Sequence, residues 1–376
     1  MPRAIALGQP TVGAEELTAV AAVFATGWLA GQGPRCRDFE AAFAEAMGTR
    51  HALAVNNCTA ALHLVVSGLK TGPGDEVVVA DYTFPATGHA VRYAGATPVF
   101  ADVRPDTWTV DPQAVAAAIT PRTVGVIAVD SFGQCADYDE LAELADRHGL
   151  WLIEDAACAA GATYRGLPAG SFGDAACFSF HGRKGITAGE GGAVTTDDDA
   201  LAAHVRKIHN FGIEGALTRA GSSGLPVPSF DELGYNYKLS DLAAAVMEVQ
   251  LRRLPELLAA RRRVADQYAL TLSGLDGVTL PYTAPDREHA WQSYVITLDR
   301  EIDRGAVAQA LREKEIGCNF GTYASHLQPV YGATAPCPVS ADLFARHLAI
   351  PMHANLSATD VERVAEAVTH AVKAAR

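Results

Sequence analysis

Polar side chains follow two short apolar segments near the middle of the chain. Residues 150–155 are mostly apolar and end at Asp155, and residues 175–181 form a second, mostly apolar segment that carries Ser179. Lys184 comes shortly after this second segment and is followed by a glycine-rich stretch. Both segments predict buried strands, and open α/β sheets bind their ligands at the carboxyl ends of such strands. We therefore expect a carboxylate, a hydroxyl and an amine to share one site.

This set of groups is what a pyridoxal phosphate (PLP) site needs. A lysine forms a Schiff base with the aldehyde, an aspartate keeps the pyridine nitrogen protonated so that the ring accepts electrons, and a serine hydroxyl binds the phosphate. We assign these roles to Lys184, Asp155 and Ser179, respectively. Each group alone has a simpler interpretation, because a loop lysine, a helix cap and a glycine turn are all common.

The same stretches resemble the DegT/DnrJ/EryC1/StrS family, the PLP-dependent sugar aminotransferases. The resemblance extends over nearly the whole chain, and its most specific parts are residues 154–157, 173–181, Lys184 and 189–192. It implies an α/β chain with the type I PLP-dependent transferase fold, which is aspartate aminotransferase-like. A large PLP-binding domain with a mainly parallel sheet is expected over residues 1–245, and a smaller C-terminal α/β domain over 246–376.

The resemblance implies further residues that contact the cofactor. Thr59, which we also expect to cap a helix, and Ala60 match the family's phosphate-binding pattern, and Phe84 matches the aromatic residue that stacks on the pyridine ring. Asn236 matches a residue that reaches the PLP phosphate of the neighbouring subunit, which implies a homodimer with shared active sites. Cys158 departs from the pattern, which has Gln or His there, and we expect it to pack near the ring as a weak donor at best.

Each of these positions also has a structural interpretation. Thr59 and Ala60 could belong to an ordinary capped helix, Phe84 to the core, and Asn236 to a helix-capping segment. On the substrate side, the resemblance offers Trp28 in a glycine-rich loop. The other substrate-side candidates are His181, Tyr323 and His326, although Trp28 and His181 are equally well explained as ordinary loop residues.

The composition narrows the classes of function. The 376 residues are 49% hydrophobic and carry a formal charge of −13, from 43 acidic and 30 basic residues. This charge argues against nucleic acid as a partner, and no apolar run approaches the ~20 residues of a membrane span. Because the first apolar stretch is too short for a secretory signal, we expect a cytoplasmic protein. The seven cysteines contain no Cys-x-x-Cys pair, so neither a zinc site nor a disulfide framework is expected.

Alternating strands and helices must position the candidate residues. Before residue 150 we expect strands over residues 51–55, 76–80, 97–103 and 124–129. Intervening helical stretches predict a mainly parallel sheet with helices on both faces. Residues 213–228 read as a long loop, which is either functional or mobile. The C-terminal domain is expected to contain a helix over 247–270, strands over 291–298 and 318–323, and helices over 304–315 and 359–374.

The expected activity is that of an aminotransferase. The resemblance implies that glutamate or glutamine donates an amino group, which passes to a nucleotide-linked keto-deoxy sugar. Lys184 moves the proton as general acid and base, for which we expect an amine pKa lowered by burial and by the protonated ring. A cyclitol or other non-sugar ketone as acceptor, a PLP-dependent sugar dehydratase, a PLP-binding regulatory protein and a binding module without cofactor remain alternatives.

Overall fold

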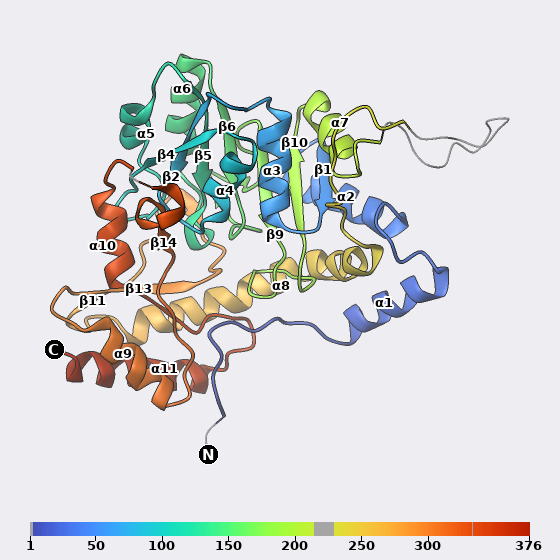
Figure 1. Cartoon of the computed structure of the whole chain (residues 1–376). Coiled ribbons are helices and arrows are strands. Elements are labelled where there is room, and N and C mark those ends of the chain that lie inside the picture. Colours follow the sequence, from blue (N-terminus) through green and yellow to red (C-terminus); the bar gives the residue numbers. More distant parts are fainter. Residues whose placement is uncertain (1–2, 214–228, 333) are drawn as a thin grey trace.

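The computed structural model describes residues 3–213, 229–332 and 334–376. Of the long loop expected over residues 213–228, only Ile213 lies among them. A seven-stranded sheet and a separate three-stranded sheet pack against the first and second halves, respectively, of the long helix α8 (Asp241–Thr271), which crosses the lower half of Figure 1. No helix in the described part of the chain is long and apolar enough to cross a membrane.

The large sheet has the strand order β1-β10-β9-β6-β5-β2-β4. Its strands are β1 (His51–Val55), β2 (Glu76–Ala80), β4 (Thr97–Ala101), β5 (Thr123–Val129), β6 (Trp151–Asp155), β9 (Ala175–Ser179) and β10 (Gly192–Thr196). Neighbouring strands from β4 to β9 pair in parallel, whereas β10 pairs antiparallel with both β1 and β9. The expected mainly parallel sheet is therefore confirmed.

Helices cover both faces of this sheet, as expected. On one face lie α2 (Pro34–Met47), α5 (Pro112–Ala118), α6 (Tyr138–His148) and the first half of α8. On the other lie α3 (Cys58–Gly68), α4 (Ala86–Tyr93) and α7 (Asp199–Ile208). The residues of β2 alternate between the two faces, since Val77 and Val79 pack with α3 and α4 while Val78 and Ala80 pack on the opposite side. Burial on both faces explains why these strands are continuous apolar runs.

The small sheet is antiparallel throughout and consists of β11 (Val278–Thr279), β13 (Tyr294–Leu298) and β15 (His347–Ile350). It packs with α9 (Arg304–Glu313), α11 (Ala358–Ala374) and the second half of α8. The strand expected over 318–323 is wrong, because only an isolated bridge, Asn319 to Ala349, joins that segment to β15. Strand β14 (Tyr323–Ala324) pairs instead with β3 (Tyr82–Thr83) of the N-terminal half.

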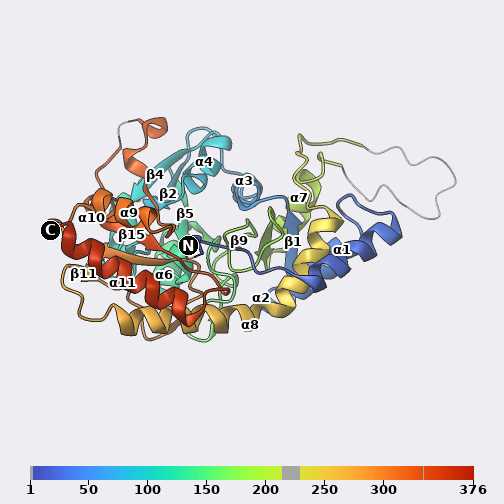
Figure 2. The ribbon, with the colours of Figure 1, turned by 90° about the horizontal axis from the view of Figure 1, so that it is seen from below.

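The remaining elements are short or peripheral. They are α1 (Ala14–Thr26), α10 (Pro338–Arg346), the strands β7 (Thr163–Tyr164), β8 (Leu167–Pro168) and β12 (Arg287–Glu288), and three 3₁₀ turns at Ser131–Gly133, Ser325–Leu327 and Pro329–Tyr331. In Figure 2, α1 lies beside one end of α8 and α11 lies along the other end.

Helix α8 contributes residues to two of the apolar clusters of the protein. Leu254 and Leu257 belong to the cluster of the large sheet, whereas Val264 and Tyr268 belong to that of the small sheet. The boundary expected between residues 245 and 246 falls inside this helix, and Ile5 from the N-terminal end packs in the small-sheet cluster. The division into two domains stays a prediction.

Candidate active site

The carboxyl ends of β6 and β9 meet beside a cavity of about 190 Å³. Strand β6 ends at Asp155, which is opposite Cys177 of β9, and the chain reaches Lys184 five residues after β9 ends at Ser179. The parallel pairing therefore brings the predicted carboxylate and amine to one edge, as the sequence requires. Five predicted residues line this cavity, namely Phe84, Asp155, Cys158, His181 and Lys184.

Asp155 is buried at the cavity wall, where a hydroxyl and a backbone amide donate hydrogen bonds to its carboxylate. Its Oδ2 accepts a hydrogen bond from Thr87 Oγ1 at 2.7 Å, and its Oδ1 accepts one from the backbone N–H of Ala157 at 3.2 Å. Burial raises the pKa of Asp155 above its usual value, while these bonds and the nearby Lys184 oppose the rise. A ring N–H bonded to this carboxylate would favour its ionised form.

Thr87 is a functional candidate that the sequence did not single out. It is buried in α4, three residues after Phe84. In the sequence, only its spacing could have indicated this role, because its hydroxyl lies one helical turn after Phe84, the predicted ring-stacking residue. That signal is weak because a Thr in the first turn of a helix usually bonds to the backbone of its own helix.

The Lys184 side chain reaches into the cavity although the residue is partly exposed. Its Nζ donates a hydrogen bond to Cys158 Sγ at 3.2 Å. Burial of Nζ lowers the pKa of Lys184, but Cys158, Cys58 and Asp155 raise it, and the result lies above the usual value. The expectation of a lowered pKa is therefore wrong for the protein alone, because it counted burial but not the acidic groups around Nζ.

Arg261 of α8 holds the backbone around Lys184 in place. The carbonyl of Lys184 accepts a hydrogen bond from Arg261 Nη2 at 3.2 Å, and Arg261 Nη1 also donates to the carbonyl of Trp291 at 2.9 Å. Arg261 is buried in α8, so this helix ties the lysine loop to the segment before β13.

Phe84 presents its ring at the mouth of the cavity. Its side chain is 62% exposed, which excludes the alternative that it belongs to the core. The ring lies edge-on to Tyr323, with 6.0 Å between centroids, and Tyr323 in turn contacts Phe320 at 5.0 Å. Phe320 lines the cavity but Tyr323 is not among its lining residues. An open aromatic face beside Lys184 suits a flat heteroaromatic ring.

The start of α3 differs in detail from the sequence prediction. Asn57, not Thr59, caps the helix, since Asn57 Oδ1 accepts a hydrogen bond from the N–H of Ala60 at 2.8 Å. Helix geometry leaves the amides of Cys58 and Thr59 without an intrahelical acceptor, which is the arrangement that binds phosphate. Thr59 and Ala60 do not line the cavity, and their contact with phosphate stays a prediction.

Ser179 and the two predicted histidines have partners within the chain. Ser179 Oγ accepts a long hydrogen bond, 3.5 Å, from the N–H of His181, and Ser179 does not line the cavity. His181 lines the cavity, with Nε2 3.9 Å from Glu190. His326 Nδ1 lies 2.7 Å from Asp81 Oδ2, and the backbone N–H of His326 donates to Asp81 Oδ1 at 2.6 Å. These contacts hold His326 outside the cavity.

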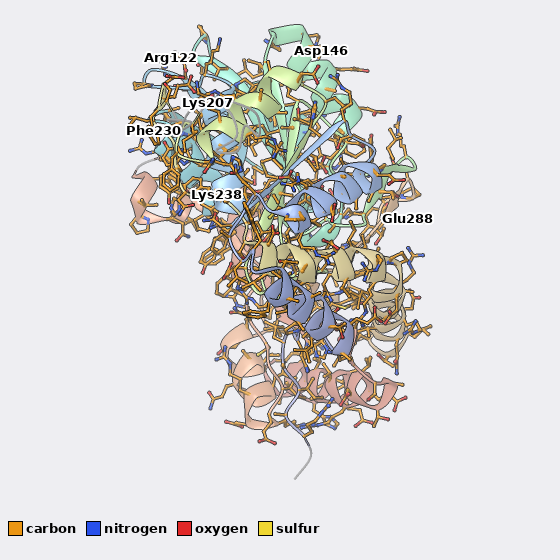
Figure 3. All side chains as sticks on the ribbon, turned by 90° about the vertical axis from the view of Figure 1, so that its right-hand side faces the viewer. Arg122, Asp146, Lys207, Phe230, Lys238 and Glu288 are labelled. Carbon is orange, nitrogen blue, oxygen red and sulfur yellow. The ribbon has the colours of Figure 1, made fainter. Side chains whose placement is uncertain are left out.

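Trp28 and Asn236 are not brought to the Lys184 cavity within one chain. Asn236 Oδ1 accepts a hydrogen bond from Lys238 Nζ at 2.7 Å. Trp28 lines a different hollow of about 970 Å³, which it shares with Lys207 and Lys238. Figure 3 shows Lys207 and Lys238 on the same side of the molecule.

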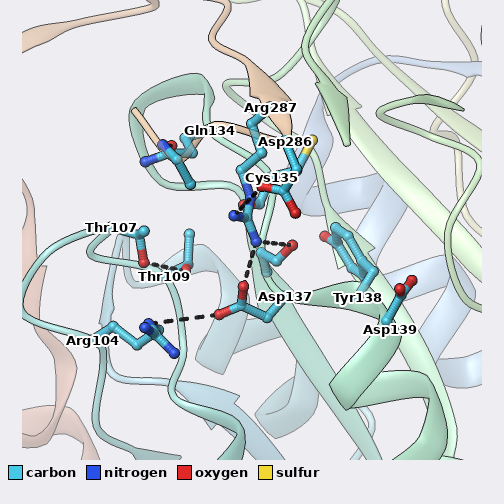
Figure 4. A network of polar contacts seen from close by, with 12 residues as sticks. Arg104, Thr107, Thr109, Gln134, Cys135, Asp137, Tyr138, Asp139, Asp286 and Arg287 are labelled. Atoms are coloured by element: carbon cyan, nitrogen blue, oxygen red, sulfur yellow. Dashed lines mark hydrogen bonds and ion pairs between the residues drawn. The ribbon is translucent and has the colours of Figure 1, made fainter. Parts of the chain in front are cut away.

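A polar network supports the segment that follows β5. Figure 4 shows Arg287 directed at Asp137, with Arg104 on the other side of the same carboxylate. Arg287 Nε also donates to the carbonyl of Cys135 at 2.8 Å. These bonds fix the segment that follows Asp130, a buried residue that lines the cavity and whose backbone N–H donates to the carbonyl of Asp155.

The residues in this cavity fit pyridoxal phosphate. A lysine amine can hold its aldehyde, and a buried carboxylate at the end of a central strand can hold its ring nitrogen. An open aromatic ring can cover the face of its ring. The buried carboxylate carries an unfavourable desolvation that a protonated ring nitrogen would relieve.

Comparison with known proteins agrees with this chemistry. Residues 10–369 match the DegT/DnrJ/EryC1/StrS aminotransferase family. The chain is 37% identical to the spore coat polysaccharide biosynthesis protein SpsC of Bacillus subtilis, over 97% of this chain and 96% of that protein.

Two solved structures show the same fold. The aminotransferase TlmJ from Streptoalloteichus hindustanus superposes with a TM-score of 0.93 at 34% identity, over 99% of this chain and 100% of TlmJ. DesI, solved in the presence of its TDP-sugar product, has a TM-score of 0.89 at 36% identity, over 100% of this chain and 94% of DesI. With the match to the family over residues 10–369, these likenesses show that the chain belongs to the DegT/DnrJ/EryC1/StrS aminotransferase family and is a PLP-dependent aminotransferase.

Proposed function

We propose that this aminotransferase moves an amino group from glutamate or glutamine to the ketone of a nucleotide-linked keto-deoxy sugar. The observation that carries the proposal is the meeting of Lys184 and Asp155 in one cavity beside the open ring of Phe84. The sugar as acceptor is supported by SpsC, a spore coat polysaccharide biosynthesis protein, and by DesI, whose product is a TDP-sugar. Both proteins match almost the full length of the chain.

Bound PLP supplies an electron sink that stabilises negative charge on the carbon from which a proton is removed. Lys184 would hold the cofactor and then, once released from it, carry the proton between donor and cofactor carbons. Asp155 would hold a proton on the ring nitrogen, and Phe84 would cover one face of the ring and keep water off it. The amides at the start of α3 and the hydroxyls of Thr59 and Ser179 would hold the phosphate.

The polar groups around the cavity suit both substrates. Arg183, which is exposed and lines the cavity, is the natural partner for the carboxylate of glutamate or glutamine, because a guanidinium binds carboxylates through two parallel bonds. Ser131, Gln292 and Asn319 also line the cavity and offer donors and acceptors to sugar hydroxyls.

We further propose a homodimer in which Asn236 reaches the PLP phosphate of the partner subunit. In support, Asn236 does not line the cavity of its own chain, and it accepts a hydrogen bond from Lys238, which lies on the side that Figure 3 faces. The same end of the molecule exposes apolar side chains on and after α1, among them Leu17 at 72% and Phe24 at 61%. A second copy covering this face would remove that apolar surface from water.

The test is the visible absorption spectrum of the purified protein, before and after addition of L-glutamate or L-glutamine. The proposal predicts a yellow band that bleaches with the donor, and Lys184→Ala should abolish both the band and turnover. Keto-sugar nucleotides added to the bleached protein should restore the band and give an amino sugar detectable by mass spectrometry. A band that persists with both donors would contradict the proposed first half of the reaction, and an active Lys184→Ala variant would refute the role of the lysine.

A further inference from the structure

Cys158 differs from the other cysteines of the protein. All seven lie in the described part of the chain, and Cys158 alone among them is partly exposed, while the other six are buried. It lines the cavity, and its sulfur accepts the hydrogen bond from Lys184 Nζ at 3.2 Å. A neighbouring ammonium stabilises the negative charge on a sulfur that attacks an electrophile, so this partly exposed pair has the features of a reactive cysteine.

We propose that peroxide joins Cys158 to Lys184 through a reversible sulfur–nitrogen bond, which makes this pair a site of oxidative modification. Forming the bond requires only these two side chains of this chain and the peroxide that oxidises the sulfur. Its consequence, loss of the lysine that holds the cofactor, rests on the function proposed above.

The chemistry balances in two steps. The sulfur of Cys158 attacks hydrogen peroxide, so that an S–O bond forms, the O–O bond breaks, and the leaving hydroxide takes up a proton to become water. The sulfur is oxidised by two electrons and the peroxide is reduced, which leaves a sulfenic acid. The nitrogen of Lys184 then attacks this sulfur. An S–N bond forms, the S–O bond breaks, and the departing hydroxide leaves as a second water with a proton from the amine.

Oxidation of Cys158 makes the amine of Lys184 a better nucleophile for the second step. Burial lowers the pKa of Lys184, and Cys158 is foremost among the groups that oppose this and raise it. A sulfenic acid is neutral, so oxidation removes this contribution of Cys158 while the burial of Lys184 Nζ remains. The pKa of Lys184 should then fall, and a larger share of the amine becomes neutral and nucleophilic beside the oxidised sulfur.

Cys58 is the competing nucleophile, and it is less well placed. Its thiol is buried, and burial together with the nearby Asp155 carboxylate raises its pKa well above the usual value. Its Sγ lies 4.0 Å from Asp155 Oδ1. Because the thiolate is the form that attacks sulfur, Cys58 reacts slowly, whereas Lys184 already contacts Cys158.

The experiment compares the full-length protein with bound PLP and the same protein after hydroxylamine has removed the cofactor. Each sample is treated with hydrogen peroxide, free thiols are blocked with iodoacetamide, and the digested peptides are measured by mass spectrometry. In the stripped sample we expect the peptides of Cys158 and Lys184 to be joined and two hydrogen atoms lighter than their sum. Dithiothreitol should restore the separate peptides, and PLP uptake should fall in proportion to the cross-linked fraction.

Variants identify the two atoms that are joined. Cys158→Ser should give no cross-link, and Cys318→Ser, at a buried cysteine of the small-sheet cluster, should leave it unchanged. Lys184→Arg should stop at the sulfenic acid, which dimedone labels on Cys158. Circular dichroism checks that each variant folds.

The outcomes separate this inference from the proposed function. A disulfide between Cys158 and Cys58, or a sulfenic acid on Cys158 that persists beside an unmodified Lys184, would overturn the inference. If PLP binds and bleaches with glutamate but no cross-link forms, the function stands and the inference fails. If bound PLP does not protect Lys184 from cross-linking, the inference stands and the assignment of Lys184 as the cofactor lysine fails.

Discussion

Thr87 donates a hydrogen bond from Oγ1 to Asp155 Oδ2 over 2.7 Å, so a residue of α4 orients the carboxylate at the end of β6. Phe84 precedes Thr87 by three residues, and the same segment therefore supplies both the ring at the cavity mouth and the donor to Asp155. Because burial raises the pKa of Asp155 and the Thr87 bond opposes that rise, Thr87 helps to keep the carboxylate ionised. We regard it as a positioning residue for Asp155, the carboxylate that we propose to hold a proton on the cofactor ring nitrogen.

Replacement of Thr87 by Val should weaken PLP binding and raise the pKa of Asp155 further. The change keeps the shape of the side chain but removes a hydrogen bond to a charged group, which contributes about 1.5–3 kcal/mol. We therefore expect a loss of about 10- to 100-fold in PLP affinity, measured by titration of the apoprotein with PLP at several pH values. The loss should be larger at low pH, where a carboxyl with a higher pKa becomes protonated.

Thr87→Ser is the matched control because it retains the hydroxyl. It should bind PLP within a few-fold of the wild type and with the same pH dependence. Equal affinity of Thr87→Val and the wild type at every pH would show that the hydroxyl does not act through Asp155.

The placement of Asp155 and Lys184 was predictable because it depends on local pattern and on one topological rule. Each apolar segment marks a strand, and parallel strands end at the same edge of a sheet. The Thr87 bond and the contact of Lys184 with Cys158 were not predictable. The first depends on how α4 packs against the end of β6, and the second on how the segments after β6 and β9 meet, and no periodicity in the sequence encodes either.

Three errors show where local sequence signals compete. Asn57 and Thr59 can both cap a helix, but the helix begins at Cys58, directly after the chain leaves β1, so Asn57 is the cap. Strand β15 escaped detection because it follows α10 directly, without a turn residue between them. The segment 318–323 has the composition of a strand, but β15 is paired with β13 along its length and leaves it only one bridge.

Replacement of Asp130 by Asn should stabilise the protein at neutral pH. Burial raises the pKa of Asp130 from 3.8 to about 6, although hydrogen bonds with Glu154, Tyr138 and the N–H of Ala136 oppose the rise. An acid with a higher pKa in the folded state loses stability as pH rises between the unfolded and folded values, so the cost is complete above about pH 6. An Asn carries no charge, and its Oδ1 can still accept the bonds from Ala136 N–H and Tyr138.

The measurement is the difference in melting temperature between Asp130→Asn and the wild type at pH 4 and pH 8. We expect an increase of about 2–4 °C at pH 8 and a much smaller difference at pH 4. Asp146→Asn, at an exposed position of α6 (Figure 3), should change neither value. A gain at pH 4 as large as that at pH 8 would mean that the buried charge is not its cause. Glu154, whose own pKa is raised by burial and by Asp130, should titrate at lower pH in the Asn variant because its acidic neighbour is gone.

Arg287→Ala should destabilise the fold by about 3–5 kcal/mol, because it removes one member of a buried ion pair and leaves Asp137 without this partner. The guanidinium also bonds to the carbonyls of Cys135 and Ala136, which then lose their donor (Figure 4). Arg262→Ala is the control, since its pair with Glu288 spans 3.8 Å at the surface and such pairs contribute about 0–1 kcal/mol. Urea denaturation measures both variants, and equal midpoints would contradict the importance of the network.

Gly192→Ala tests how the start of α3 is held against the sheet. A Cβ at Gly192 would lie 2.6 Å from the carbonyl carbon of Asn57 and 2.8 Å from the N–H of Cys58, so the first turn of α3 would have to move. We expect a destabilisation of about 1–3 kcal/mol. We also expect PLP affinity to fall at least about tenfold, because the amides of Cys58 and Thr59 that we assign to the phosphate would be displaced.

Gly72→Ala provides the comparison, because nothing lies within 4 Å of a Cβ built there. It should leave both the urea midpoint and PLP affinity close to those of the wild type. If Gly192→Ala lowers stability while PLP affinity is unchanged, the phosphate does not depend on the first turn of α3. Competition by inorganic phosphate gives a second measurement. Phosphate should compete with PLP for the wild type and compete more weakly for Gly192→Ala, because the amides of Cys58 and Thr59 no longer point to one place.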